Sequence, residues 1–227
     1  MIDLKLQLFG WEDIEDSENN DIDFLKFPEG NTIIRIIDEK PYTRWTHWIP
    51  QANEGKGASI TCIGKGCPVC EIISQAKANK EKPKYNSRKV HAMRTINRTT
   101  GKVEINEQGK MFYQNLNSIR QAVGDVRAYD IKVIRKGTGK SDTSYTLLPL
   151  APSGKYEMKD DKYKFIDYDD KDKELVDNNF SFDEFYAKPD VETILQILDG
   201  KSFSEIFGNK EDDIEDTEDD IEVDFTK

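Results

Sequence analysis

Cysteine and histidine are scarce in this chain of 227 residues, which contains three cysteines and two histidines. All three cysteines lie between Cys62 and Cys70. An odd, tightly clustered set argues against a framework of paired disulfides and fits a reducing cytosol. No apolar run approaches the roughly 18 residues of a membrane-spanning helix. The N-terminus also lacks the basic and apolar regions of a signal peptide, so we expect a cytoplasmic protein without a membrane partner.

Apolar residues are also few, at 36% of the chain against 34% charged residues, which predicts that part of the chain does not pack into a core. The charges are unevenly placed. Residues 1–30 carry 2 basic and 9 acidic side chains, residues 31–160 carry 23 and 12, and residues 161–227 carry 8 and 23, for net charges of −7, +11 and −15. A basic middle between acidic ends suggests a nucleic-acid partner and an acidic tail.

The cysteine cluster has the composition of a zinc site. Cys62, Cys67 and Cys70 form the pattern Cys-x4-Cys-Pro-Val-Cys, and His47 lies upstream of it. Thiolates and imidazole are ligands of structural zinc, and a Cys-x-x-Cys turn that leads into a helix supplies two of them together. We predict one structural Zn²⁺ per chain, held by these four residues. His91 remains the alternative fourth ligand, and three unliganded cysteines are the alternative to a metal site.

Hydrophobic periodicity predicts a mostly β chain with short helices, folded as a curved, mostly antiparallel sheet or barrel. The chain divides into an acidic N-terminal arm (1–23), a core (24–208) and an acidic tail that does not order itself (209–227). Strands are expected in 31–37, 44–50, 89–98, 102–106 and, as a hairpin, 130–150. Helices are expected in 71–82 and 180–208, and residues 111–123 are expected to form a short strand and then a helix.

Basic and aromatic residues are interleaved through the middle of the chain. A single strand of DNA or RNA exposes base faces, on which aromatic rings stack, and a line of phosphates, which lysine and arginine follow. Duplex-binding proteins instead tend to place a basic helix in a groove, and this sequence has no strongly basic helix. The candidate nucleic-acid contacts are Arg44, Trp45, Trp48, Lys65, Tyr85, Arg88, Lys89, Arg94, Arg98, Phe112, Tyr113, Arg135 and Lys136.

Together these features resemble the single-stranded DNA-binding, helix-destabilising proteins of tailed phages, the T-even type especially. The ligand order of that family, with histidine first and Cys-x-x-Cys last, matches His47, Cys62, Cys67 and Cys70, although the spacings differ. The resemblance implies an oligonucleotide-binding (OB) fold stapled by zinc. It also implies that the acidic tail recruits replication and recombination proteins, and the candidate contacts there are Asp219, Asp220, Glu222, Asp224 and Phe225.

One departure from that family concerns the N-terminus. Cooperative members carry a basic N-terminal arm that binds the neighbouring protein, whereas residues 1–30 are acidic here. Self-association along DNA therefore stays open as an expectation.

The sequence thus predicts a non-enzymatic protein that binds single-stranded DNA with little sequence preference. It would protect and organise the DNA during phage replication, recombination and repair in the cytoplasm of the infected bacterial host. Zinc is expected to hold the fold rather than to touch DNA. One alternative is a zinc-stabilised adaptor for other proteins, with the acidic ends as its working surfaces. A second, with less support, is a metal-dependent nuclease, for which the basic middle offers only scattered carboxylates.

Overall fold

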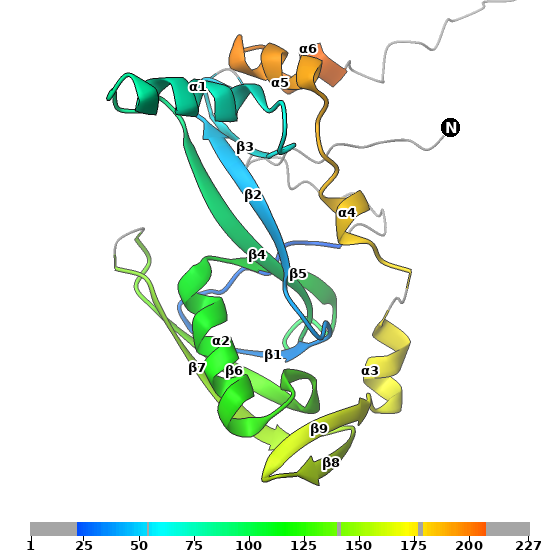
Figure 1. The fold of residues 1–227 in the computed structure, drawn as a ribbon. Helices are drawn as coiled ribbons and strands as arrows, with labels where there is room; N and C mark the ends of the chain where they lie inside the picture. Colours follow the sequence, from blue (N-terminus) through cyan, green and yellow to red (C-terminus); the bar gives the residue numbers. More distant parts are fainter. Residues whose placement is uncertain (1–21, 54, 140–141, 177–178, 208–227) are drawn as a thin grey trace, which may run out of the picture.

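The computed structural model of the protein describes residues 22–53, 55–139, 142–176 and 179–207. The fold is a mostly β, antiparallel arrangement with short helices (Figure 1), which confirms the predicted fold class and is consistent with an OB-like fold. One sheet has the strand order β3-β2-β4-β1-β6-β7, with β5 also paired to β4, and β8 pairs with β9 in a second sheet. The strands are β1 (Gly30–Ile36), β2 (Tyr42–Ile49), β3 (Ala58–Thr61), β4 (Asn86–Asn97), β5 (Val103–Gln108), β6 (Tyr129–Lys136), β7 (Ser144–Pro152), β8 (Lys155–Lys159) and β9 (Lys162–Asp167).

Strand β4, with 12 residues, is the element on which both halves of the molecule are built. Its first half pairs with β2, from Trp48 opposite Asn86 to Tyr42 opposite Ala92. Its second half lies between β1 and β5. The sheet therefore continues from a lobe formed by β1, β5, β6, β7 and α2 (the sheet lobe) into a lobe formed by β3, α1, α5 and α6 (the cysteine lobe), as Figure 1 shows.

The two lobes have separate apolar cores. In the sheet lobe, Ile34, Ile131 and Val133 point inward from β1 and β6 and pack against α2. In the cysteine lobe, Ile60 of β3 packs against α1 and against Ile194 of α5. The helices are α1 (Pro68–Ala78), α2 (Lys110–Val123), a 3-10 turn η1 (Val126–Ala128), α3 (Asp170–Leu175), α4 (Phe182–Phe185), α5 (Val191–Leu198) and α6 (Phe203–Phe207). Within the described part of the chain, no helix is long and apolar enough to cross a membrane.

Helix α2 corrects one expectation from the sequence. The prediction of a short strand at the start of 111–123 is wrong, because Lys110–Val123 is helical throughout. Phe112 and Tyr113 favour strands by propensity. They lie at helical spacing from Leu116, however, and all three are buried against the sheet, so tertiary packing overrides the local preference.

The β8–β9 hairpin is an element that the sequence analysis did not predict, because its residues are highly charged. The turn consists of Asp160 and Asp161, whose φ angles of 50° and 59° are typical of a two-residue hairpin turn. Tyr163 and Phe165 alternate with lysines along β9 and pack half-buried against the core of the sheet lobe. The feature of the sequence that could have predicted this hairpin is the pair Asp160–Asp161 between two segments in which polar and apolar residues alternate.

The C-terminal part of the chain returns along the sheet to the cysteine lobe (Figure 1). Residues Phe180–Tyr186, here called the aromatic strap, pack on β2, β4 and β5. The Phe182 ring stacks on Tyr42 with centroids 5.1 Å apart and an interplanar angle of 10°. The Tyr42 hydroxyl donates a hydrogen bond of 2.7 Å to Asp183. Helices α5 and α6 then complete the core of the cysteine lobe. One or two helices were expected in 180–208, and the structure has three short ones there, α4, α5 and α6.

Candidate functional site

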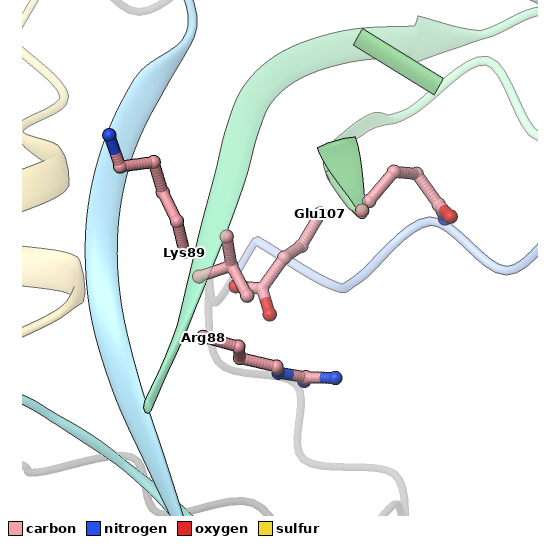
Figure 2. Close-up of a pocket in the computed structure, with 6 residues that line it drawn as sticks. Arg88, Lys89 and Glu107 are labelled. Atoms are coloured by element: carbon pink, nitrogen blue, oxygen red, sulfur yellow. The ribbon is translucent and has the colours of Figure 1, made fainter. Parts of the chain in front are cut away.

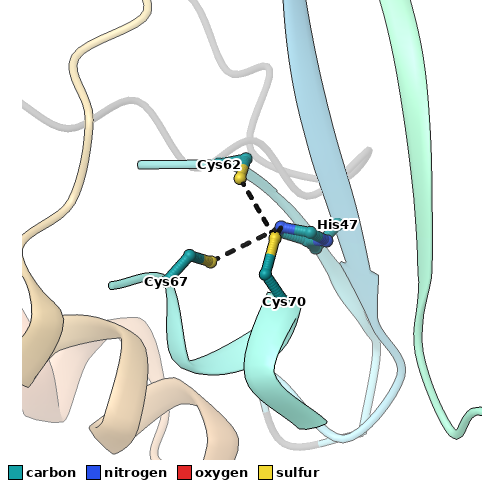
Figure 3. Close-up of side chains that lie close together, drawn as sticks. All are labelled: His47, Cys62, Cys67 and Cys70. Carbon is teal, nitrogen blue, oxygen red and sulfur yellow. Dashed lines mark hydrogen bonds between the residues drawn. The ribbon is translucent and has the colours of Figure 1, made fainter. Parts of the chain in front are cut away.

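Four metal-ligating side chains converge in the cysteine lobe. One potential ligand atom each from His47, Cys62, Cys67 and Cys70 lies within 4.8 Å of all the others (Figure 3). Nε2 of His47 is 3.5 Å from the Sγ atoms of both Cys67 and Cys70, and the Sγ atoms of Cys62 and Cys70 are also 3.5 Å apart. The structure thus brings together the four residues predicted as metal ligands.

Local backbone geometry explains this convergence. His47 lies on β2, Cys62 follows β3 directly, and Cys67 and Cys70 stand at the first turn of α1. The chain between Cys62 and Cys67 turns through Gly64, whose φ of 82° favours glycine. Cys67 donates its backbone N–H to the carbonyl of Gly64 at 3.2 Å, and Pro68 starts the helix.

The donor set fits zinc. Ligand atoms of a zinc tetrahedron with Zn–S of about 2.3 Å and Zn–N of about 2.0 Å lie about 3.5–3.8 Å apart, close to the contacts seen here. Burial lowers the pKa of His47, which favours the neutral imidazole that binds metals. Its other nitrogen, Nδ1, lies 3.0 Å from Ser87 Oγ, a contact of the kind that orients a metal-ligating ring.

The closely spaced thiols would lose their protons more readily with a cation at the centre of this cluster. Burial, reinforced by the neighbouring Cys62 and Cys67, raises the pKa of the Cys70 thiol to about 12 when no metal is present. A divalent cation reverses that effect, because it stabilises closely spaced thiolates. The alternative ligand His91 is elsewhere: its Nδ1 lies 2.8 Å from Thr43 Oγ1 and its ring packs on Tyr113.

Trp45 is the most exposed aromatic ring among the predicted nucleic-acid contacts, with 51% of its surface accessible. It lies on β2 directly opposite Lys89 of β4, and the Lys89 ammonium is 5.3 Å from the ring centroid. Opposed residues of paired strands share a face of the sheet. The pair therefore presents a flat apolar ring and a cation side by side to solvent.

Trp48 is also exposed, at 48%, but alternation along β2 places it on the opposite face from Trp45. Gly57 packs against its ring so closely that a Cβ at position 57 would collide with it. Arg88 follows on the same face as Trp48, since β4 residues alternate in register with β2. Lys65 and Lys136 are exposed elsewhere on the surface.

The edge of β4 between these two faces is open. Strand β5 covers β4 only from His91 onward, where His91 lies opposite Gln108. Among the described strands none pairs with this edge from Asn86 to Val90. A shallow pocket lies where β5 ends (Figure 2), and it is lined by Arg88, Lys89, Val90, Glu107, Gln108 and Gly109.

Four arginines predicted as phosphate contacts have partners within the protein. Arg44 pairs with Glu107 at 2.8 Å, and Arg94 pairs with Asp38 at 2.7 Å. Arg98 bridges two carboxylates, those of Asp130 and Asp172. Arg135 donates to the carbonyl of Phe27 at 2.5 Å. These contacts correct the prediction that the four guanidinium groups stand open to phosphates.

Three aromatic rings predicted to stack on bases lie in the apolar cores. Tyr85, Phe112 and Tyr113 are 4%, 3% and 7% exposed. Tyr85 belongs to the core of the cysteine lobe, and the other two belong to that of the sheet lobe. Their burial corrects the expectation that these rings are available for stacking.

With this geometry in view, comparison with known proteins gives one informative likeness. This chain is similar to a probable ssDNA-binding protein of Escherichia phage T5. The two are 26% identical over 160 residues, which is 62% of this chain and 60% of the T5 protein. The chain thus spans about 60% of the length of that relative. No family model matches the chain.

The pocket residues Val90, Glu107, Gln108 and Gly109 were not among the sequence candidates. Nothing in their local sequence marks them, because the pocket depends on where β5 ends relative to β4. The acidic-tail candidates Asp219, Asp220, Glu222, Asp224 and Phe225 lie outside the described residues, as does the N-terminal arm up to residue 21.

Proposed function

We propose that this protein binds single-stranded DNA with little sequence preference and has no enzymatic role. The observation that carries the proposal is the pair formed by Trp45 and Lys89, an exposed ring beside a cation on an uncovered part of the sheet. A base stacked on such a ring contributes about 1–3 kcal/mol, and the cation lies where a phosphate follows. The likeness to the T5 protein supports the same function.

Zinc would act in this function as a structural staple, one ion per chain. The metal ligand His47 lies on β2 between Trp45 and Trp48, so the ion would fix the strand that presents both rings. This role agrees with a zinc-stapled OB-like core of the T-even type. His47 and Cys67 are buried, so the ion would act from inside the cysteine lobe.

The biological setting is part of the same proposal. The protein would coat and protect single strands during phage replication, recombination and repair in the cytoplasm of the infected bacterium. Its acidic tail would recruit other replication and recombination proteins, and self-association along the strand stays an open part of this proposal. The competing hypothesis is a zinc-stabilised adaptor that uses its acidic ends and binds no DNA.

Fluorescence anisotropy of a labelled oligo-dT tests the proposal. The full chain and a chain ending at Gly208 would be titrated at low salt, and we expect saturable binding by both. Absence of binding by both forms would favour the adaptor. Intact labelled strands after incubation with Mg²⁺ are expected in the same samples, and cleavage would instead favour the nuclease alternative.

A further inference from the structure

The pocket at the open edge of β4 is lined by both hydrogen-bond donors and a hydrogen-bond acceptor. Arg88 is exposed, and no ion pair involves it among the residues that the structure describes. Glu107 accepts one bond from Arg44 at 2.8 Å, and a carboxylate can accept more than one. Gln108 has an amide that both donates and accepts. The pocket thus offers donors and an acceptor within a small space.

Register places Arg88 and Glu107 on one face of the sheet and Gln108, opposite His91, on the other face at the same edge. Glu107 lies opposite Ala92, two residues beyond Val90, and Arg88 points to the same face of β4 as Ala92. Figure 2 shows Arg88 and Glu107 extending into the space beside the strand end, whereas Lys89 extends over β2. The unpaired β4 edge beside them carries backbone donors and acceptors that no described strand uses.

The pocket also lies next to the surface assigned to DNA. Lys89 lines it and contacts Trp45 with the same side chain. Trp45 and Lys89 lie on one face of the sheet, and Arg88 and Glu107 on the other. A strand that stacks one base on Trp45 would therefore cross the open edge of β4 to bring the next base to Arg88 and Glu107. The walls are suited to the polar edge of a base rather than to its face.

We propose that this pocket holds one base of the bound strand and favours cytosine over uracil or thymine, an inference that rests on the proposed function. The exocyclic amino group of cytosine donates to a carboxylate such as that of Glu107. Its N3 and O2 atoms accept from Arg88 or Gln108. Uracil and thymine present a carbonyl oxygen where cytosine has the amino group, and this oxygen would face the Glu107 carboxylate without a proton between them.

The test compares two oligonucleotides that differ only in the base they carry throughout. Oligo-dC and oligo-dU of equal length would be titrated with the full, zinc-containing chain by anisotropy. One or two hydrogen bonds gained by cytosine predict a preference of about fivefold for oligo-dC. The Gly109→Leu variant is expected to remove the preference, because it should weaken binding of oligo-dC more than binding of oligo-dU. A Cβ at Gly109 meets nothing within 4 Å, so the position has room for the first atom of a side chain.

The matched control is Gly109→Ala, which makes the same change at the start of α2 with a side chain too small to fill the pocket. It is expected to retain the preference, and all three proteins should melt within a few degrees of one another. Equal affinity of the wild type for oligo-dC and oligo-dU, or a preference that persists in folded Gly109→Leu, would overturn the inference. Loss of preference in Gly109→Ala would overturn it too, because helix capping would then be the cause. Failure to bind either oligonucleotide would instead overturn the proposed function.

Discussion

Two cations, Lys89 on β4 and Arg98 just after it, show that tertiary contacts give different roles to residues of the same charge. Lys89 is exposed and meets only the Trp45 ring among its described contacts. Arg98 follows the end of β4 and donates to Asp172 at 2.5 Å and to Asp130 at 2.9 Å. Asp130 also accepts from the fully buried Arg35 at 2.6 Å. The first cation remains available to a ligand, and the second belongs to the framework.

The exposed pair gives a prediction about DNA affinity. Trp45→Ala is expected to weaken oligo-dT binding by about 1–3 kcal/mol through lost stacking. Lys89→Ala is expected to reduce the slope of log affinity against log salt by about 0.7 through one lost phosphate contact. Anisotropy titrations at several salt concentrations measure both effects.

Lys164→Ala is the charge-matched control, because Lys164 pairs with Glu157 on the β8–β9 hairpin, away from β2. It should leave both affinity and salt slope unchanged. The assignment of the binding surface would be wrong if Lys164→Ala and Lys89→Ala changed the salt slope equally.

The internal arginine gives the opposite prediction. Arg98→Ala leaves Asp172, which is 1% exposed, without its cation. We expect the free energy of unfolding to fall by about 3 kcal/mol, because an uncompensated buried charge remains. Urea denaturation measures this change. DNA affinity measured at a temperature where the variant is folded should stay within about twofold of wild type, and a large loss would restore Arg98 as a phosphate contact.

At the scale of elements, the cluster of His47 with the three cysteines joins separate pieces of the chain. Strand β3 has only four residues, and α1 has two buried side chains, Val69 and Ile73. The four ligands tie β2, the end of β3 and the start of α1 to one point. Without metal, these pieces would be held mainly by the small core shared with α5.

Metal removal is therefore expected to destabilise the cysteine lobe. Zinc analysis should find one ion per chain, and chelation or Cys67→Ser should lower the melting temperature markedly. The effect on DNA affinity below the transition should be smaller, because the buried His47 and Cys67 would hold the ion inside the cysteine lobe. Equal melting temperatures with and without metal would contradict the structural role of zinc.

At the scale of the whole molecule, charge is segregated along the chain. The middle, residues 31–160, carries a net charge of +11, and residues 209–227 alone carry 10 acidic and 2 basic side chains, a net of −8. In the proposed function, such a tail would compete electrostatically with DNA for the basic surface, at a range set by the Debye length of about 10 Å at 0.1 M salt.

Removal of the tail is expected to strengthen binding. A chain ending at Gly208 should bind oligo-dT more tightly than the full chain at low salt, and the difference should shrink as salt rises. A full-length chain whose tail carries Asn and Gln in place of Asp and Glu should behave like the truncated chain. Identical affinities for the full and truncated chains would rule out competition by the tail.

Local features of the chain were sufficient for part of this description. The pattern from Cys62 to Cys70 predicted that the three cysteines lie together, because closely spaced residues depend mainly on one turn of backbone. The structure brings His47 to them rather than the alternative His91. Alternation and turn residues also predicted most strands of the large sheet. The β8–β9 hairpin and the helical start of α2 were missed, because in both cases contacts with the core decide the structure.

The sequence by itself determined the cysteine cluster, the mostly β class and the segregation of charge, since each depends on residues that are close along the chain. Only the tertiary structure decided which cations and rings face solvent. Arg98 is paired by Asp172, 74 residues away, and Tyr85 is buried against Gln51 and the C-terminal helices. The open edge of β4 likewise follows from the register of β5. Burial, ion pairing and strand edges depend on which distant segments of the chain come into contact, and the local sequence does not reveal those contacts.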